Sequence, residues 1–260
     1  MPKVSTITPC YKMEKYIQGF LEHLPSQTIL NDIEIVLDHN EPTDDEIKLI
    51  NEYNEKYGNI KHIIVDNVDP IGTSMNRCIK ESSGEYLCIW NVDDLRTPNS
   101  IEIMSKVLDE NPEVDFVYGN YIVVNKFNSS GTGYLVDESN KEHLLKKGMI
   151  LGPFFMFRKS AIEKSGMFDE QLVSGADFDL ALRLAMNGNG KHIPEILGFY
   201  LNEGLGASTK PNSKQPLERT VIELRYGLNV IDSNLIAEAK KYDIDHIKID
   251  NNLYKKELFI

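Results

Sequence analysis

Residues 71–94, IGTSMNRCIKESSGEYLCIWNVDD, contain the pattern that decides the fold. Gly72–Ser83 reads as a short helix, and Tyr86–Trp90 is an apolar run with the length of a buried strand. Two carboxylates, Asp93 and Asp94, follow that strand. Adjacent acids repel each other, and partial burial raises the cost. A cation or a set of hydrogen-bond donors is therefore expected beside them.

Three earlier runs have the same strand character: Val4–Ile7, Ile33–Leu37 and His62–Val65. Each is short, rich in β formers, and followed by a polar turn and a helix-like segment. This alternation predicts a parallel sheet with helices on both faces. Ligands of such sheets bind outside the carboxyl ends of the strands, where the acid pair falls.

Several helix ends are also readable. Thr43 and Glu46 have the spacing of a capping box, and Gly58 is placed to end that helix. Thr97 is expected to cap another helix, with Pro98 in its first turn.

The second half of the sequence lacks the regular alternation of strand-like and helix-like segments. Val114–Val124 and Phe154–Arg158 read as strands, residues 175–190 as a helix, and the tail from Pro216 as mostly helical and charged. We expect three segments, residues 1–112, residues 113–212 and a helical extension over 213–260, within one compact domain.

Composition limits the function. The 260 residues carry a net charge of −12, which argues against nucleic-acid binding. No apolar run approaches the roughly 20 residues of a membrane span. The three cysteines form no Cys-x-x-Cys pair, and neither a zinc site nor a disulfide framework is indicated. We therefore expect a cytoplasmic enzyme; a peripheral membrane association stays open.

Three stretches together resemble family 2 glycosyltransferases, which have the nucleotide-sugar-binding GT-A fold. They are VSTITPCY (4–11), IEIVLDHNEPTDD (33–45) and the opening stretch ending in NVDD. GPFFMFRKSAIEKSGMFDEQLVSGADFDLALRLAMNG (152–188) is similar to the acceptor region of that family. The resemblance covers about residues 3–205, and it implies a mainly parallel mixed α/β sheet flanked by helices. It further implies that residues 1–112 form the nucleotide-sugar-binding half and residues 113–212 the acceptor-binding and catalytic half.

The resemblance implies nucleotide contacts for Thr8, Pro9, Tyr11, Asp38 and Asn76. Tyr11 would stack on the base, although a core tyrosine is the plainer alternative. His39 stands where the family often has a second acid, and Met75 where it often has Arg; Arg77 is a neighbouring substitute. Uracil is the default base.

In the matching acid motif, Asn91 would contact the ribose, and Asp93 would ligate Mn²⁺ or Mg²⁺ that bridges the diphosphate. Asp94 would assist the metal or hold the loop. Such hard cations prefer carboxylate and phosphate oxygens. The plainer alternative is a capped turn.

Asp177 matches the acid that serves this family as general base, although it could be only a helix N-terminal acid favoured by the dipole. Asp179 is expected to pair with Arg183 at i+4. His23, His62, His143, His192 and His246 show no paired metal spacing.

The implied function is inverting transfer of one sugar from a nucleoside diphosphate donor, by default a UDP-sugar, to a hydroxyl of a glycan or glycolipid acceptor. Surface polysaccharide or glycoconjugate synthesis is the expected setting. Two alternatives stay open: a nucleotidyltransferase that makes nucleotide sugars, and a non-catalytic nucleotide-sugar-binding module. The first would want a Gly-rich phosphate loop, and Asn91 and Ala176 favour the second.

Overall fold

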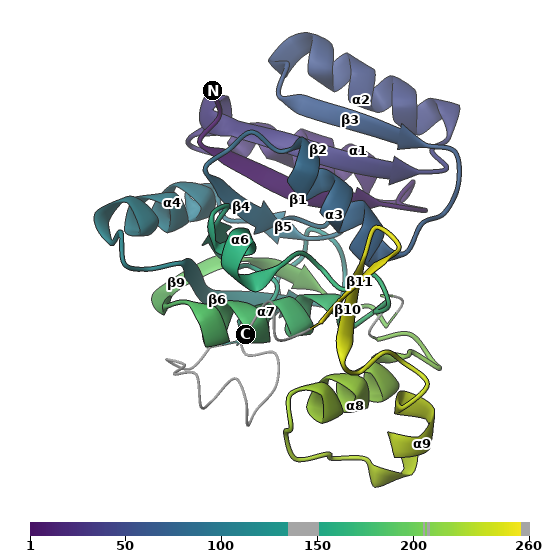
Figure 1. Ribbon diagram of the computed structural model, residues 1–260. Coiled ribbons are helices and arrows are strands. Elements are labelled where there is room, and N and C mark those ends of the chain that lie inside the picture. The colour runs from purple at the N-terminus through teal and green to yellow at the C-terminus, as the bar shows by residue number, and fades with distance from the viewer. Residues whose placement is uncertain (135–150, 205, 207–208, 256–260) are drawn as a thin grey trace.

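A computed structural model describes residues 1–134, 151–204, 206 and 209–255 (Figure 1). Its main sheet has the order β3-β2-β1-β4-β8-β6-β9-β5, with β7 paired to β6. The strands are β1 Val4–Cys10, β2 Ile33–Asn40, β3 Ile60–Val65, β4 Tyr86–Ile89, β5 Leu95–Arg96, β6 Phe116–Val124, β7 Thr132–Tyr134, β8 Met156–Arg158 and β9 Gly190–Leu201. The helices are α1 Ile17–His23, α2 Asp44–Tyr57, α3 Ile71–Glu81, α4 Ser100–Glu110, α6 Ala161–Ser165, α7 Ala176–Asn187, α8 Gln215–Arg225 and α9 Ile236–Ala239.

The first four strands of the sheet order confirm the predicted parallel arrangement. β1 pairs in parallel with β2 and with β4, and β2 pairs in parallel with β3. β8 then runs antiparallel to both β4 and β6, and β9 runs parallel to β6. The result is a mixed, mainly parallel sheet, as the sequence predicts.

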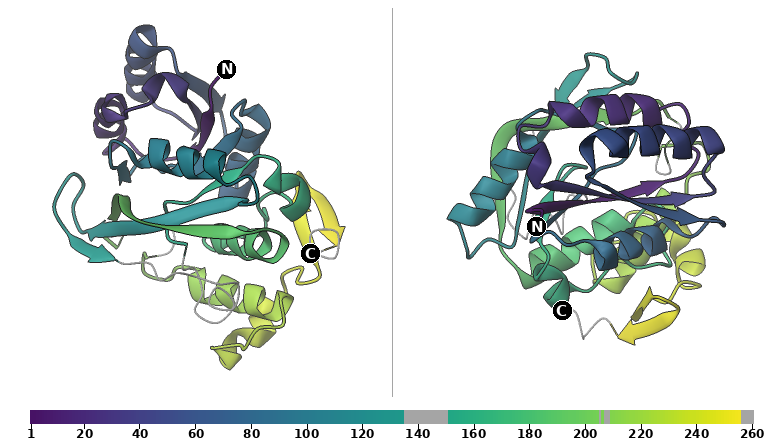
Figure 2. Two further views of the ribbon diagram at one scale, coloured as in Figure 1. Left: turned by 90° about the vertical axis from the view of Figure 1, so that its left-hand side faces the viewer. Right: turned by 90° about the horizontal axis from the view of Figure 1, so that it is seen from above.

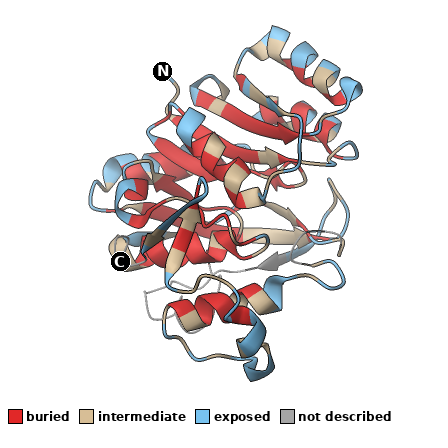
Figure 3. Ribbon diagram, turned by 45° about the vertical axis from the view of Figure 1, so that its right-hand side comes forward, coloured by how far each residue is buried: buried red, intermediate tan, exposed pale blue. Residues whose placement is uncertain are grey.

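Helices cover both faces of this sheet (Figure 2). One apolar cluster joins the sheet to α1, α2 and α4 through side chains such as Phe20, Ile50 and Met104. A second cluster, on the opposite face, joins it to α3, α7 and α8 through Ile79, Leu180 and Ile222. Figure 3 shows the consequence: the central strands are buried, and exposed residues gather on the outer helix surfaces and loops.

Two boundary predictions are confirmed, and a third is wrong. The Thr43–Glu46 capping box forms at α2, and Gly58 ends that helix with a φ of 65°. Thr97 does not cap α4, which begins at Ser100. Leu95–Arg96 pairs with β9, and the hydroxyl of Thr97 donates to the carbonyl of Ile196.

The C-terminal segment is helical only in its first part. After α8, η3 (Ser233–Leu235) and α9, it forms an antiparallel hairpin of β10 His246–Ile249 and β11 Asn252–Lys255. Ile247 and Ile249 point inward while their neighbours are more exposed, the alternation of a half-buried strand. Among the described residues, no helix has the length and apolar character needed to cross a membrane.

Candidate active site

The candidate active site lies where the parallel strands β1, β2 and β4 end. Pro9 and Cys10 lie beside Asp38 and His39 in the β1–β2 register. The backbone N–H of Trp90 donates to Ile7 at 3.1 Å, which brings the acid loop after β4 beside the end of β1. Segments distant in sequence therefore meet at one edge of the sheet, as they do in nucleotide-binding α/β folds.

The two adjacent acids of this loop have different environments. Asp94 is buried, and its carboxylate accepts from the backbone N–H of Leu201 at 3.0 Å and from the Asn91 amide at 3.2 Å. Asp93 is partly exposed. Burial raises the pKa of both carboxyls, and the charge of Asp93 raises that of Asp94 further. Asp94 thus has the geometry of a loop anchor, the second of its two expected roles.

Asp93 has the features of a hard-cation ligand. Within the described part of the chain, no side chain donates a hydrogen bond to its carboxylate, whereas both oxygens of Asp94 are engaged. The raised pKa of Asp93 reflects a carboxylate that has lost water without gaining a positive partner. A divalent cation bound there would supply that charge, so the site fits Mn²⁺ or Mg²⁺.

The end of β1 presents an aromatic ring. Tyr11 is half-buried, and Lys12 Nζ lies 5.0 Å from its ring centroid, in cation–π contact. Its exposure distinguishes it from the core tyrosine of the plainer alternative. Pro9 is half-buried, but Thr8 is buried, with its hydroxyl 2.8 Å from that of Thr6. Thr8 can therefore contribute to the site mainly through its backbone.

Asp38 is fully buried in a charged network. It accepts from Asn40 Nδ2 and from Arg77, each at 2.7 Å, and Arg77 also pairs with Asp69. Desolvation raises the pKa of the Asp38 carboxyl, and the Arg77 charge opposes that shift. Arg77 thus supplies a guanidinium beside the acid, while the neighbouring Met75 is buried in the core.

Asn76 lies in α3 and faces the protein interior. Its amide donates to the carbonyl of Phe168 at 3.0 Å and to Glu170 at 3.2 Å, and it accepts from the N–H of Phe168 at 2.8 Å. The side chain is fully buried, so these bonds take the place of the expected nucleotide contact. Asn76 instead fastens α3 to the segment that leads into α7.

A close backbone contact strengthens the same junction. A Cβ built on Gly72 of α3 would lie 2.9 Å from the carbonyl oxygen of Asp169. Only glycine allows this approach without displacing backbone.

Asp177 and Asp179 occupy the start of α7 but face different surroundings. Asp177 is partly exposed, and its carboxylate accepts from the N–H of Phe178 at 2.8 Å. Asp179 is fully buried and pairs with Arg183 at 2.7 Å, which confirms the predicted pairing, and with Arg225 at 2.8 Å. Desolvation raises the pKa of the Asp177 carboxyl. Asp177 is thus the accessible proton acceptor of the two.

The topology places the start of α7 toward the edge of the sheet where β1, β2 and β4 end. α7 leads back to the beginning of β9, and β9 is parallel to β6. Since β6 and β4 both run antiparallel to β8, β9 has the direction of β4. The N-terminus of α7 therefore lies toward the carboxyl ends of β1 and β4 (Figure 1).

One contributor to the site has no signal in the local sequence. Glu218 of α8 is fully buried, and its carboxylate accepts backbone N–H groups of Val173, Ser174 and Gly175 at 2.7–3.0 Å. It thereby anchors the loop before α7, whose N-cap residue is a glycine. His143, one of the histidines considered above, lies outside the described residues.

Comparison with known proteins agrees with this geometry. Glycosyl transferase family 2 matches residues 5–166, and the chain belongs to this family. It is 27% identical to a chondroitin synthase of Escherichia coli over 211 residues, 81% of this chain and 30% of that protein. It is also 27% identical to a hyaluronan synthase of Pasteurella multocida, over 81% of this chain and 21% of that protein. The chain thus spans less than a third of either relative.

Solved structures share the fold. S. aureus TarS, residues 1–349 in complex with UDP-GlcNAc, superposes with a TM-score of 0.68 at 19% identity, covering 86% of this chain and 65% of that one. Mannosyltransferase PcManGT from Pyrobaculum calidifontis, in complex with GDP-Man and Mn²⁺, gives 0.58 at 16% identity, covering 93% and 65%. At these identities the likeness concerns the fold, which is the expected GT-A type.

Proposed function

We propose that this chain is a metal-dependent, inverting glycosyltransferase that moves one sugar from a nucleoside diphosphate donor to an acceptor hydroxyl. The observation that carries the proposal is that the two adjacent acids after β4, Asp93 and Asp94, have different partners. Asp94 holds the loop through Leu201 and Asn91, and this leaves the Asp93 carboxylate open at the edge where the parallel strands end.

The donor is held by groups from the first half of the chain. Tyr11 stacks on the base, Asn91 contacts the ribose, and Asp93 ligates Mn²⁺ or Mg²⁺. The cation, when bound, neutralises the charge that develops on the departing diphosphate. UDP-sugar stays the default donor, because TarS, which shares the fold, was solved with UDP-GlcNAc.

The acceptor is activated from the second half. Asp177 takes the proton of the acceptor hydroxyl while that oxygen attacks the anomeric carbon and the diphosphate leaves. A single displacement of this kind inverts the anomeric configuration. The raised pKa of the Asp177 carboxyl favours this role, since a stronger base accepts the proton more readily.

We extend the proposal to a glycan or glycolipid acceptor in polysaccharide or glycoconjugate synthesis. It is supported by the similarity to a chondroitin synthase and a hyaluronan synthase, whose names refer to polysaccharides. The three cysteines are free and buried, which agrees with action in the reducing cytoplasm.

Calorimetry against a panel of nucleoside diphosphates, with Mn²⁺ and with chelator, tests the donor site. We expect one diphosphate to bind more tightly with Mn²⁺, and Asp93→Ala to remove most of that difference. Asp66→Ala is the matched control, because Asp66 is an exposed acid just after β3 at the same edge. Unchanged metal dependence in Asp93→Ala would place the cation elsewhere.

Hydrolysis of the corresponding nucleotide sugar, with and without Mn²⁺, tests the chemistry. A transferase releases nucleoside diphosphate, with water as a slow acceptor. A nucleotidyltransferase would instead join a sugar phosphate to a nucleoside triphosphate, and a binding module would release nothing. Either result would refute the proposed transfer.

A further inference from the structure

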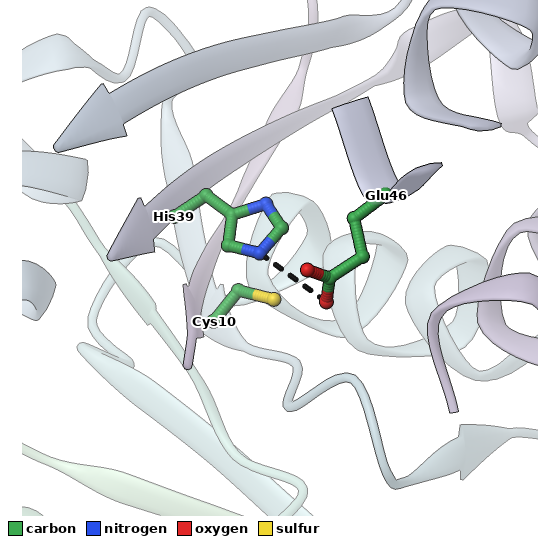
Figure 4. Close-up of side chains that lie close together, drawn as sticks. All are labelled: Cys10, His39 and Glu46. Atoms are coloured by element: carbon green, nitrogen blue, oxygen red, sulfur yellow. Dashed lines mark ion pairs between the residues drawn. The ribbon is translucent and has the colours of Figure 1, made fainter. Parts of the chain in front are cut away.

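Three side chains of types that can ligate metals lie together, and none of them has a role in the proposed transfer. Cys10 ends β1, His39 lies near the end of β2, and Glu46 is in the first turn of α2 (Figure 4). One potential ligand atom from each lies within 4.8 Å of the other two. Their residue exposures are 2%, 0% and 3%. A thiol, an imidazole and a carboxyl group are therefore gathered in a site closed to bulk water.

The atoms that face one another lack hydrogen-bond partners. Both His39 Nε2 and Glu46 Oε1 are buried without a hydrogen bond and lie 3.5 Å apart, so they form an ion pair only when His39 is protonated (Figure 4). Burial lowers the pKa of His39, which favours the neutral imidazole and leaves both atoms without a partner. Leaving such atoms unpaired costs about 1–3 kcal/mol each, so the pair calls for an explanation. Two ligands at 2.0–2.1 Å from a tetrahedral Zn²⁺ lie about 3.3–3.4 Å apart. The observed separation already suits a shared ion.

The opposite side of each ligand is held in place. Glu46 Oε2 accepts from both the backbone N–H and the hydroxyl of Thr43, each at 2.8 Å, which leaves Oε1 turned toward the cluster. His39 Nδ1 lies 3.3 Å from His62 Nε2. A proton on Nδ1, donated to His62, leaves Nε2 free to bind a metal. Such outer partners are typical of metal sites.

We propose that Cys10, His39 and Glu46 bind a divalent zinc ion. Sulfur, nitrogen and oxygen ligands together suit Zn²⁺, whereas the oxygen-only environment of Asp93 suits Mg²⁺ or Mn²⁺. Binding replaces the S–H bond of Cys10 by a sulfur–zinc bond and releases the proton to solvent. The three side chains would leave the fourth position of a tetrahedral Zn²⁺ to a small non-protein ligand such as water. This ion is distinct from the cation proposed for the transfer reaction.

The position of the site gives the ion a structural consequence. It ties β1, β2 and α2 together immediately before Tyr11 and beside Asp38. Zinc therefore fixes the backbone that carries the base-stacking ring. It does so at a point where the family resemblance implies an acid and this chain has His39.

Cobalt substitution tests the site directly. Chelator-treated protein titrated with Co²⁺ should develop the near-ultraviolet charge-transfer absorption of a cobalt–thiolate bond. Cys10→Ser should abolish this band. Cys78→Ser is the matched control: Cys78 is equally buried, and a serine there can still donate to the Val36 carbonyl. Asp93→Ala should also keep the band, which separates this ion from the cation proposed for transfer.

Zinc competition against bound Co²⁺ gives the affinity of each variant. His62→Leu should weaken zinc binding by roughly 10–100-fold, the usual effect of losing an outer partner. Glu46→Gln should weaken it by more, while the glutamine keeps the capping box of α2. Circular dichroism verifies that each variant is folded.

Three results would overturn the proposal. They are a folded wild-type protein that shows no band, a band that survives Cys10→Ser, and zinc affinity unchanged in Glu46→Gln. The first would leave a buried imidazole–carboxyl pair without a metal. The second would assign the thiolate to another cysteine.

Discussion

Replacing either aspartate of α7 by asparagine should separate catalysis from stability. Asp177→Asn keeps the size of the side chain and an oxygen that can accept the Phe178 N–H, so folding is retained. It cannot take a proton. Since a positioned general base contributes about 10²–10⁴-fold, the transfer rate should fall by that factor, or about 2.7–5.4 kcal/mol in activation free energy.

Asp179→Asn should act on stability instead. Asp179 is fully buried and faces Arg183 and Arg225, and the Tyr226 hydroxyl donates to it at 2.9 Å. Removing the charge of Asp179 takes one carboxylate away from Arg183 and Arg225, so these two buried guanidinium groups are no longer fully neutralised. Breaking a buried pair costs about 3–5 kcal/mol. For a chain of this size the melting temperature should fall by roughly 6–20 °C.

The assays are matched for both variants. Thermal unfolding by circular dichroism gives stability, calorimetry with Mn²⁺ gives donor affinity, and single-turnover release of nucleoside diphosphate gives the chemical rate. Asp177→Asn should change only the last. A stable Asp179→Asn that has lost activity, beside an active Asp177→Asn, would make Asp179 the base. Full activity in both would leave α7 without the base of the proposed mechanism.

Three further predictions follow from the same contacts. Tyr11→Ala should weaken nucleotide binding by about 1–3 kcal/mol in calorimetry while Tyr11→Phe loses little; equal losses would assign the effect to the hydroxyl. Burial raises the pKa of Asp177, and the general base acts in its ionised form. As the pH is lowered, the transfer rate should therefore begin to fall at a pH above about 4, the usual pKa of an aspartate. A rate that stays constant down to that pH would refute this prediction. Arg225→Met should cost about 3–5 kcal/mol in denaturant unfolding, since it leaves Asp169 and Asp179 short of a cation, whereas Lys106→Met in an exposed i,i+4 pair should cost under about 0.5; equal costs would contradict it.

Local signals predicted much of the first half of the fold. The capping box of Thr43 and Glu46 and the left-handed Gly58 are fixed by residues a few positions apart. The buried strands are equally recognisable, because runs such as Ile33–Leu37 have to be mostly apolar in a sheet covered on both faces. These elements match the structure to within a few residues.

The errors arose where distant segments determine the local structure. Thr97 has the sequence of a helix cap, yet β9 draws residues 95–97 into an edge pairing, so the helix starts later. The C-terminal hairpin depends on burying Ile247 and Ile249 against the rest of the protein. Neither the pairing with β9 nor the burial of the hairpin can be recognised in the short sequence pattern from which the local element was predicted.

In the candidate site, too, local sequence predicts part of the arrangement, and contacts between distant segments determine the rest. The sequence places Asp93 and Asp94 at a strand end, but the N–H of Leu201, more than a hundred residues away in the chain, determines which of them is engaged. The cluster of Cys10, His39 and Glu46 has no recognisable metal spacing. It forms only because β1 and β2 are neighbours and α2 folds back over their ends.

In the proposed mechanism, the C-terminal segment contributes to the site, although the family match ends at residue 166. Glu218 holds the loop before α7 in place, and its negative charge raises the pKa of Asp177 further. Both effects favour a general base, because one fixes its position and the other makes it a stronger proton acceptor. Arg225, on the same helix, pairs with Asp179 and thereby ties the first turn of α7 to α8. In the proposed mechanism, α8 therefore sets the position and the basicity of the group that activates the acceptor, while the first half of the chain sets the donor.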